Sequence, residues 1–195
     1  MGESSFLKTS LSDFVERLAS AEATPGGGAV AALAGALAAA LGSMAAELTT
    51  SKAKYAEVHA PVAEIAGRLG RARRMLAALL DDDAAAYEAL SAVMKRPKDD
   101  PSRSAALAEA AAAAAAVPLQ IATLARKVRL DLARLVTIAN PNLRSDVEVG
   151  LHMARAAMHG AAIMVRVNLP MVGGERAEQV ERELNELLAD PSEHH

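Results

Sequence analysis

Apolar residues recur along most of this chain with the three- and four-residue spacing of α-helices. The longest such stretch runs from Pro61 to about Met94, where leucine and isoleucine side chains fall on one helical face. Shorter stretches at residues 11–18 and 175–188 predict two amphipathic helices. The stretch from Gly28 to Thr49 is apolar around its whole circumference, which predicts a helix at the centre of the fold or in a subunit interface.

Prolines and polar turns bound the remaining helices. A fourth helical region is expected from Ser102 to about Ala139, kinked or restarted at Pro118 because proline lacks a backbone N–H. A fifth is expected to run to about Leu169, before Pro170. Neither an internal repeat nor a long linker divides the chain. We therefore predict one all-α domain over residues 1–193, a dimeric orthogonal or up-and-down bundle with long central helices, and interpret residues 194–195 as a tag remnant.

Composition narrows what such a bundle can do. The absence of cysteine excludes disulfides, thiolate catalysis and cysteine-bound zinc. With no Trp, two Phe, two Tyr and a net charge of −3, nucleic-acid binding is not expected. Residues 26–46 are uncharged and long enough to span a bilayer, but their Ala and Gly content favours a buried helix of a soluble protein. Charged residues near the N-terminus argue against a signal peptide, so we expect a cytoplasmic protein with no membrane partner.

Three consecutive glycines, Gly26, Gly27 and Gly28, follow Pro25 at the start of the apolar helix. Backbone N–H groups at a helix N-terminus lack helical partners and carry the positive end of the helix dipole. The segment therefore suits an anion or a carbonyl-rich ring, and the alternative is a flexible turn. No strand precedes the glycines and no Gly-Lys-Ser/Thr follows them, so neither a dinucleotide-binding fingerprint nor a P-loop fits.

Asp83 falls on the apolar face of the 61–94 helix, within four positions of Leu79, Leu80 and Tyr87. A carboxylate there must be paired, hydrogen-bonded or protonated, because burial of a bare charge is costly. Asp83 is thus either a structural hydrogen-bonding group or a working acid or base. Asn168 is a second polar residue on an apolar helical face, at a position where a leucine would be expected.

A polar cluster of Asn140, Asn142, Ser145 and Asp146 marks the start of the fifth helix. Helix capping accounts for one or two of these residues, and four together point to a site.

Other charged residues lie on stripes or in loops. Glu148, His152 and His159 share one stripe, but nearby arginines favour an ion-paired surface over a metal site, and we expect no metal. Lys54 and Lys98 lie in the loops that flank the 61–94 helix, where they either meet an anionic ligand or are simply surface residues.

The order of these motifs resembles the cyclodeaminase/cyclohydrolase family of folate enzymes. That family includes the C-terminal half of formiminotransferase-cyclodeaminase and stand-alone methenyltetrahydrofolate cyclohydrolases. The segments that carry the resemblance are residues 11–18, 24–32, 48–49 with 54–55, 83–87, 96–98, 118–119, 140–142 with 145–146, and 165–169. Two positions depart from the family pattern. Ala139 stands where a Gly is usual, and Met164 stands where an Asn is common, which removes an amide donor and acceptor.

The resemblance implies an all-α homodimer that binds a tetrahydrofolate derivative near the glycines, with no cofactor. In the cyclohydrolase, water attacks the methenyl carbon and 10-formyltetrahydrofolate forms. In the cyclodeaminase, N10 attacks the formimino carbon and ammonia leaves. We favour the hydrolase because no formiminotransferase domain is attached. The alternatives are the cyclodeaminase and a non-catalytic folate-binding or scaffold protein of the same fold.

The predicted site combines the motif positions with the residue-level reasoning. Asp83 and Asp146 are the predicted catalytic residues. The predicted substrate contacts are Gly26, Gly27, Gly28, Lys54, Lys98, Asn140, Asn142, Ser145, Arg166 and Asn168.

Overall fold

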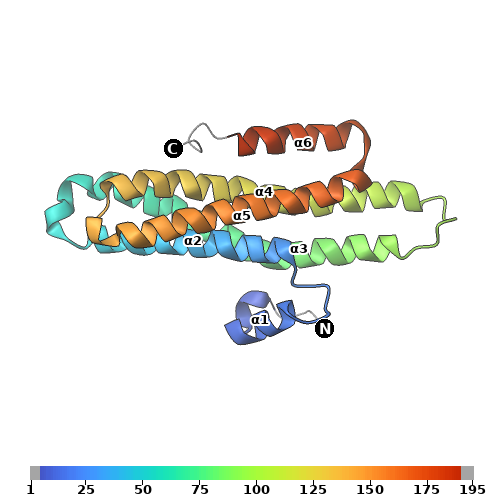
Figure 1. Cartoon of the computed structure of the whole chain (residues 1–195), viewed down its shortest axis with the longest axis horizontal. Helices are drawn as coiled ribbons and strands as arrows, with labels where there is room; N and C mark the ends of the chain where they lie inside the picture. Colours follow the sequence, from blue (N-terminus) through green and yellow to red (C-terminus); the bar gives the residue numbers. More distant parts are fainter. Residues whose placement is uncertain (1–4, 190–195) are drawn as a thin grey trace.

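The computed structural model describes residues 5–189, and every regular element within this range is helical, as the sequence predicts. A 3₁₀ turn at Phe6–Lys8 and α1 (Leu11–Leu18) precede four long helices, α2 (Gly27–Thr50), α3 (His59–Met94), α4 (Arg103–Ile138) and α5 (Arg144–Val172). The 3₁₀ turns η2 (Ala53–Val58) and η3 (Pro141–Leu143) join α2 to α3 and α4 to α5, and α6 (Gly174–Leu188) follows α5. The four long helices lie lengthwise beside one another, with α1 and α6 on opposite sides (Figure 1).

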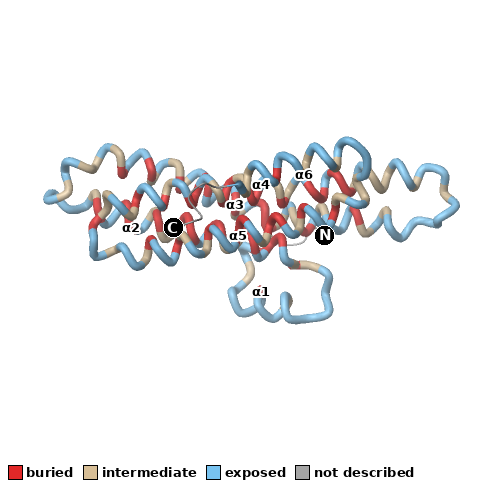
Figure 2. The backbone as a smooth tube through the Cα atoms, turned by 45° about the horizontal axis from the view of Figure 1, so that its top comes forward, coloured by how far each residue is buried: buried red, intermediate tan, exposed pale blue. Residues whose placement is uncertain are grey.

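The four long helices form a closed ring in which α2 and α4 each pack against both α3 and α5. Small residues let α2 come close to its neighbours: a Cβ at Gly42 would overlap side-chain atoms of Leu69 on α3 and Leu132 on α4. The buried residues line the inside of this ring (Figure 2). Within one chain, however, one face of α2 is not covered by the other helices: Val30 and Leu37 on this face are 38% and 46% exposed.

Two prolines lie inside helices rather than at their ends. α4 continues through Pro118 and α5 continues through Pro170 to Val172. The expected end before Pro170 was therefore wrong, and of the two alternatives at Pro118, a kink or a restart, the restart was wrong. Each proline removes one helical hydrogen bond. Packing against two neighbouring long helices stabilises α4 and α5 enough for both to continue.

The N-terminal arm is attached to α3 by a few contacts. Ser10 caps α1, as its sequence pattern predicts, because its side chain accepts a hydrogen bond from the Asp13 N–H at 3.0 Å. Phe6 and Phe14 pack edge to face with their ring centroids 5.9 Å apart. The Phe6 N–H donates to a carboxylate oxygen of Asp81 on α3 at 2.8 Å. These contacts anchor the arm beside the long helices.

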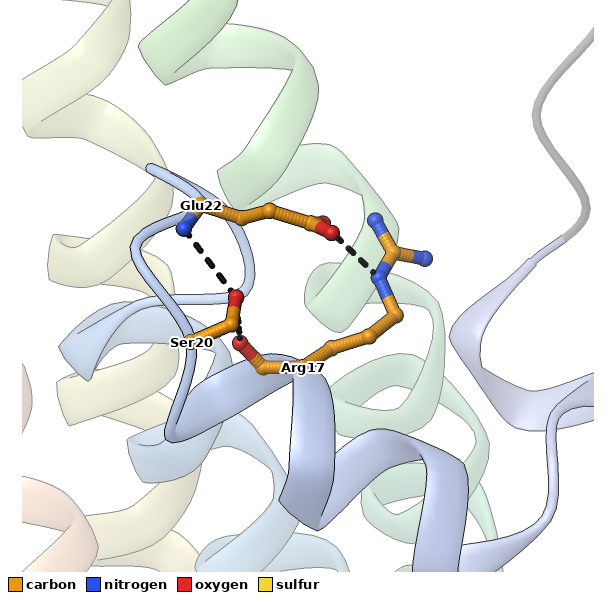
Figure 3. A network of polar contacts seen from close by, with 3 residues as sticks. All are labelled: Arg17, Ser20 and Glu22. Atoms are coloured by element: carbon orange, nitrogen blue, oxygen red, sulfur yellow. Dashed lines mark hydrogen bonds and ion pairs between the residues drawn. The ribbon is translucent and has the colours of Figure 1, made fainter.

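Polar contacts shape the turn after α1 (Figure 3). The Ser20 hydroxyl donates to the Arg17 carbonyl at 2.8 Å and accepts from the Glu22 N–H at 3.0 Å. The Arg17 Nε donates to the Glu22 carboxylate at 3.1 Å. This network directs the chain into residues 23–26, which border the cavity described below.

Two helices, α2 and α4, are long and apolar enough to cross a bilayer by length and composition alone. In the structure both are members of the ring, and the most apolar window of α2 is 56% buried against the rest of the chain. A core helix of a soluble protein has the same composition, so these helices are weak evidence for a membrane location.

Candidate active site

A cavity of about 290 Å³ lies where α2 begins. The first residues of α2 contact Asp83 of α3 and Met164 of α5. Both neighbouring helices extend past this point, α3 to Met94 and α5 to Val172, whereas α2 begins at Gly27. No part of α2 therefore fills the space between the ends of α3 and α5. The loop before α2, together with α3, α4 and α5, lines the resulting cavity: Ala23, Thr24, Gly26, Gly27, Asp83, Tyr87, Leu90, Ser91, Met94, Ala114, Met164, Val167, Asn168 and Met171.

The Asp83 carboxylate lies directly against the N-terminus of α2. A Cβ at Gly28 would overlap all three atoms of this carboxylate, so only glycine allows the approach. Burial raises the pKa of Asp83, and a hydrogen bond from the Ala29 N–H opposes that effect. The Ala29 N–H at this helix start therefore already has a hydrogen-bond acceptor, whereas the sequence suggested N–H groups that are free to bind an anion.

Asn168 is buried in the same cavity, with 8% of its surface exposed. Its side-chain Nδ2 donates to the Ala114 carbonyl of α4 at 3.2 Å and to the Met164 carbonyl of its own helix at 3.0 Å. The first of these bonds joins α5 to α4 at the cavity wall. The sequence prediction that Asn168 sits on a buried face is confirmed.

Most of the remaining lining is apolar, and part of it was missed at the sequence level. A Cβ on Gly27 would lie 3.1 Å from the Met164 sulfur. Met164, one of the two residues that depart from the family pattern, therefore faces the glycine segment. Tyr87 and Ser91 follow Asp83 at four-residue intervals along α3 and line the cavity with it. That spacing was visible in the sequence and could have identified Ser91.

A second group of predicted residues lies at the opposite end of α2. Asn140 is almost fully buried, and its N–H donates to the Thr49 hydroxyl at 3.0 Å. The Asn140 side-chain oxygen accepts from the Tyr55 hydroxyl at 2.7 Å and from the Asn142 N–H at 3.2 Å. Gly28 and Thr49 are 21 residues apart on one helix, which places the two groups about 30 Å apart.

Several predicted residues lie outside the cavity lining. Asn142 and Ser145 are exposed beside Asn140, at the start of α5, and Asp146 is half-buried in the first turn of that helix. Arg166 donates to Glu181 at 3.0 Å and to Asn185 at 2.8 Å, so it ties α5 to α6.

The two predicted lysines lie at opposite ends of α3. The Lys54 ammonium stands 4.7 Å from the centre of the Tyr55 ring, in η2 before that helix. Lys98 is exposed in the loop after it, four residues beyond the cavity-lining Met94. Lys98 is thus on the cavity side of the chain and Lys54 on the Asn140 side.

This arrangement suits proton transfer to or from a ligand group that enters a mostly apolar cavity. A carboxyl group whose pKa is raised above its ordinary value of 3.8 holds a proton more readily than an exposed aspartate does, which suits a general acid or base. Thr24, Tyr87 and Ser91 add hydroxyl groups to the wall, and the rest is largely aliphatic. Among residues 5–189, no three His, Asp or Glu side chains gather as they would around a metal ion.

The fold and the site together describe an all-helical bundle with a candidate acid or base in a cavity large enough for a ligand. Comparison with known proteins identifies the family to which this bundle belongs. Residues 10–186 match the family model for formiminotransferase-cyclodeaminase. A methenyltetrahydrofolate cyclohydrolase from Methylorubrum extorquens is 36% identical over 183 residues, which cover 91% of this chain and 88% of the relative. The formimidoyltransferase-cyclodeaminase of Sus scrofa is 34% identical over 193 residues, but the chain spans only 36% of its length.

The fold agrees with these sequence matches. The crystal structure of formiminotetrahydrofolate cyclodeaminase from Thermotoga maritima superposes with a TM-score of 0.87 at 29% identity, over 94% of this chain and 90% of that one. The chain therefore belongs to the formiminotransferase-cyclodeaminase family of folate one-carbon enzymes. The resemblance inferred from the sequence motifs is confirmed.

Proposed function

We propose that this enzyme hydrolyses 5,10-methenyltetrahydrofolate to 10-formyltetrahydrofolate, with Asp83 as its acid–base group and without a cofactor. The observation that carries the proposal is the half-buried Asp83 carboxylate, whose pKa is raised by burial, in a mostly apolar cavity. The cyclohydrolase of M. extorquens, which this chain matches over 88% of its length, supports the choice of reaction.

The chemistry needs little beyond a positioned acid and base. The oxygen of a water molecule adds to the methenyl carbon between N5 and N10, and Asp83 accepts one proton from that water. The bond from the carbon to N5 then breaks, and Asp83 returns its proton to N5. As the formyl C=O forms on N10, the hydroxyl proton leaves to solvent, so one proton is released in total. Because the substrate is already an activated amidinium, orientation and proton transfer account for the catalysis.

The cyclodeaminase reaction is the second candidate. The T. maritima neighbour, at a TM-score of 0.87, is a formiminotetrahydrofolate cyclodeaminase. In that reaction N10 takes the place of water as the nucleophile, and the same carboxyl group would protonate the departing ammonia. The two reactions therefore make the same demand on Asp83 and differ in whether water must reach the carbon.

Two assays on one preparation distinguish these activities. The first follows the loss of methenyltetrahydrofolate absorbance above the uncatalysed rate, and the second follows ammonia release from 5-formiminotetrahydrofolate. We expect enzyme-dependent loss of the methenyl compound. Ammonia release without methenyl hydrolysis would replace the first proposal by the second, and folate binding with neither reaction would refute both.

We also propose that the enzyme is a homodimer joined through the outer faces of α2 and α5. Large apolar side chains are 38–60% exposed on these two helices: Val30, Leu37, Met44, Leu48, Val149, Ile163 and Val167. α2 and α5 pack against each other in opposite directions, since Gly27 meets Met164 and Gly150 meets Leu41. The exposed residues recur at heptad-like intervals on each helix, so both stripes form one apolar face suited to a second copy.

A dimer of this kind offers a role for the polar group at the far end of α2. If the two α2 helices run in opposite directions across a two-fold axis, the Asn140 end of one protomer lies beside the Asp83 end of the other. Asn142, Ser145 and Asp146, which are exposed or half-buried, would then face the partner's cavity, whereas Asn140 is buried within its own protomer. Val167 belongs both to the exposed stripe and to the cavity wall, which places that wall at the edge of the proposed interface.

Complementation between inactive variants tests the shared site. Asp83→Asn and Asp146→Asn proteins are each expected to be inactive, with Glu148→Gln as a matched control for the loss of a carboxylate on α5. Unfolding and refolding the two inactive variants together should restore about a quarter of parental activity, because half of the dimers carry one intact site of two. No recovery, in a mixture that sedimentation shows to be dimeric, would mean that both aspartates act in the same protomer. Parental activity of Asp146→Asn alone would mean that Asp146 has no role.

The proposed interface has its own test. Leu37→Glu should produce monomers in sedimentation experiments at micromolar concentration, because it buries a charge in an apolar contact. If this variant sediments as a dimer, as the parent is expected to, the interface does not include Leu37 and lies elsewhere. A cytoplasmic location and a single folding unit over residues 1–193 complete the proposal. Residues 194–195, interpreted as a tag remnant, lie outside the described range.

A further inference from the structure

The middle of α4 contains a backbone acceptor that its own helix leaves without a donor. Pro118 has no N–H, so the carbonyl of Ala114, four residues earlier, lacks its usual helical partner. The side-chain Nδ2 of Asn168, on α5, donates to that carbonyl at 3.2 Å. Asn168 thus takes the place of the missing backbone donor.

These contacts determine the orientation of the Asn168 amide. Its Nδ2 makes a second bond, at 3.0 Å, to the Met164 carbonyl. Both partners are carbonyl oxygens, which only accept, so the nitrogen of the amide must face them and both of its N–H groups are used. The polar atom that remains is Oδ1. Because Asn168 also lines the cavity, this oxygen is what the side chain can offer to a ligand.

We propose that Pro118 is a positioning residue for ligand recognition, because it holds the Asn168 amide with its oxygen toward the cavity. The inference rests on the proposed function and makes it more specific. Asn168 acts as a hydrogen-bond acceptor in the same cavity as the acid–base group Asp83. The matching ligand is a flat heterocycle with N–H donors along one edge, and the reduced pterin ring of a folate carries ring and amino N–H groups of this kind.

Pro118 does not line the cavity, so its replacement separates positioning from direct contact. The Pro118→Ala change supplies a backbone N–H to the Ala114 carbonyl, which then competes with Asn168. We expect faster hydrogen exchange of the Asn168 side-chain amide in NMR spectra. We also expect KM for 5,10-methenyltetrahydrofolate to rise roughly 2- to 10-fold, as for a weakened hydrogen bond, with kcat nearly unchanged.

Pro170→Ala is the matched control. It also places an N–H inside a cavity-side helix, but the carbonyl it completes is that of Arg166, which does not accept a bond from Asn168. This control should leave the exchange rate of the Asn168 amide and KM unchanged. Equal effects of the two proline changes would show a general loosening of the helices and would overturn the inference.

A second variant tests the same point if Pro118→Ala proves too unstable for NMR. Asn168→Asp keeps the size of the side chain and an acceptor oxygen but removes both donors, so the Ala114 and Met164 carbonyls lose their partner. We expect KM to rise more than in Pro118→Ala. Parental KM in this variant, or parental amide exchange in Pro118→Ala, would refute the positioning role. If the parent enzyme itself converts no folate, the proposed function fails, and amide exchange still tests the effect of Pro118 on Asn168.

Discussion

The two ends of α2 carry polar groups of opposite character. At its C-terminal end, three hydrogen bonds join Asn140 to Thr49, Tyr55 and Asn142, and Asn140 is 2% exposed. At its N-terminal end, Asp83 lies at a cavity, and burial raises its pKa despite the Ala29 hydrogen bond. Matched polar groups at one end hold the ring of helices together, whereas the incompletely compensated carboxyl group at the other end is suited to reaction.

This difference shows why a buried polar residue does not by itself identify a catalytic site. Asn140 is buried and Asp83 is half-buried, and both belong to the motifs that carry the family resemblance. The adjoining space distinguishes them: Asp83 lines a cavity, whereas the Asn140 side-chain oxygen already accepts two hydrogen bonds at the other end of α2. Four substitutions or conditions test the contrast.

The largest expected effect is on Asp83 itself. Asp83→Asn should reduce turnover by roughly 100-fold or more, the usual scale for loss of a general acid or base. The neighbouring Asp82 is exposed and does not line the cavity, so Asp82→Asn should retain parental rates and serves as the control. Initial rates on methenyltetrahydrofolate, together with circular dichroism spectra, would decide the matter. Parental rates in a folded Asp83→Asn protein would exclude Asp83 from the mechanism.

The second largest effect on activity is expected for Gly28, the glycine that lies against Asp83. Gly28→Ala would force the carboxylate away from the start of α2, and a displacement of about 1 Å can lower turnover by up to 100-fold. Gly26→Ala is the matched change, since its Cβ meets only the Ala23 carbonyl at an ordinary 3.7 Å. We expect loss of activity in the first variant and nearly full activity in the second, measured as kcat/KM. Similar losses in both would mean that flexibility of the glycine segment matters more than the position of Asp83.

At the opposite end of α2, the expected effect is on stability. Asn140→Ala removes the acceptor for Tyr55 and for the Asn142 N–H, which should lower the free energy of unfolding by about 1–3 kcal/mol. Asn142→Ala removes an exposed side chain and should change that free energy by less than about 0.5 kcal/mol. Denaturant titrations give both values. An Asn140→Ala protein as stable as the parent would contradict the structural role assigned to this end.

The smallest effect is a difference in pH dependence. Because the native pKa of Asp83 lies above its ordinary value of 3.8, the native state holds this proton to higher pH than the unfolded state does. The Asp83 contribution to stability should therefore fall as the pH rises from 3.8 through the native pKa, and remain lost above it. Asp83→Asn lacks this decline, so its unfolding temperature should gain on that of the parent with increasing pH. A constant difference between the two proteins would indicate an unshifted pKa.

Much of the fold was predictable because the helical signals are local. The 61–94 stretch carries regular leucine spacing, and the structure places α3 at His59–Met94. The sequence left a restart at Pro118 open and placed the end of the fifth helix before Pro170. The cost of a proline is local, whereas the packing that stabilises α4 and α5 comes from residues distant in sequence. Ser91 shows the same limit in the site: its spacing from Asp83 was visible, but the cavity that gives the spacing meaning was not.

The sequence by itself determined the all-α class, the main helical segments and the family, since these depend on periodicity and on the order of motifs. It also marked Asp83 and Asn168 as polar residues on apolar faces. Only the tertiary structure decided that α2 begins partway along the bundle, so that a cavity opens beside Asp83 and Asn168 while Asn140 lies about 30 Å away. The physical reason is that spacing along one helix places a residue on a face, whereas distances between helices depend on how the small side chains of α2 pack against α3 and α5.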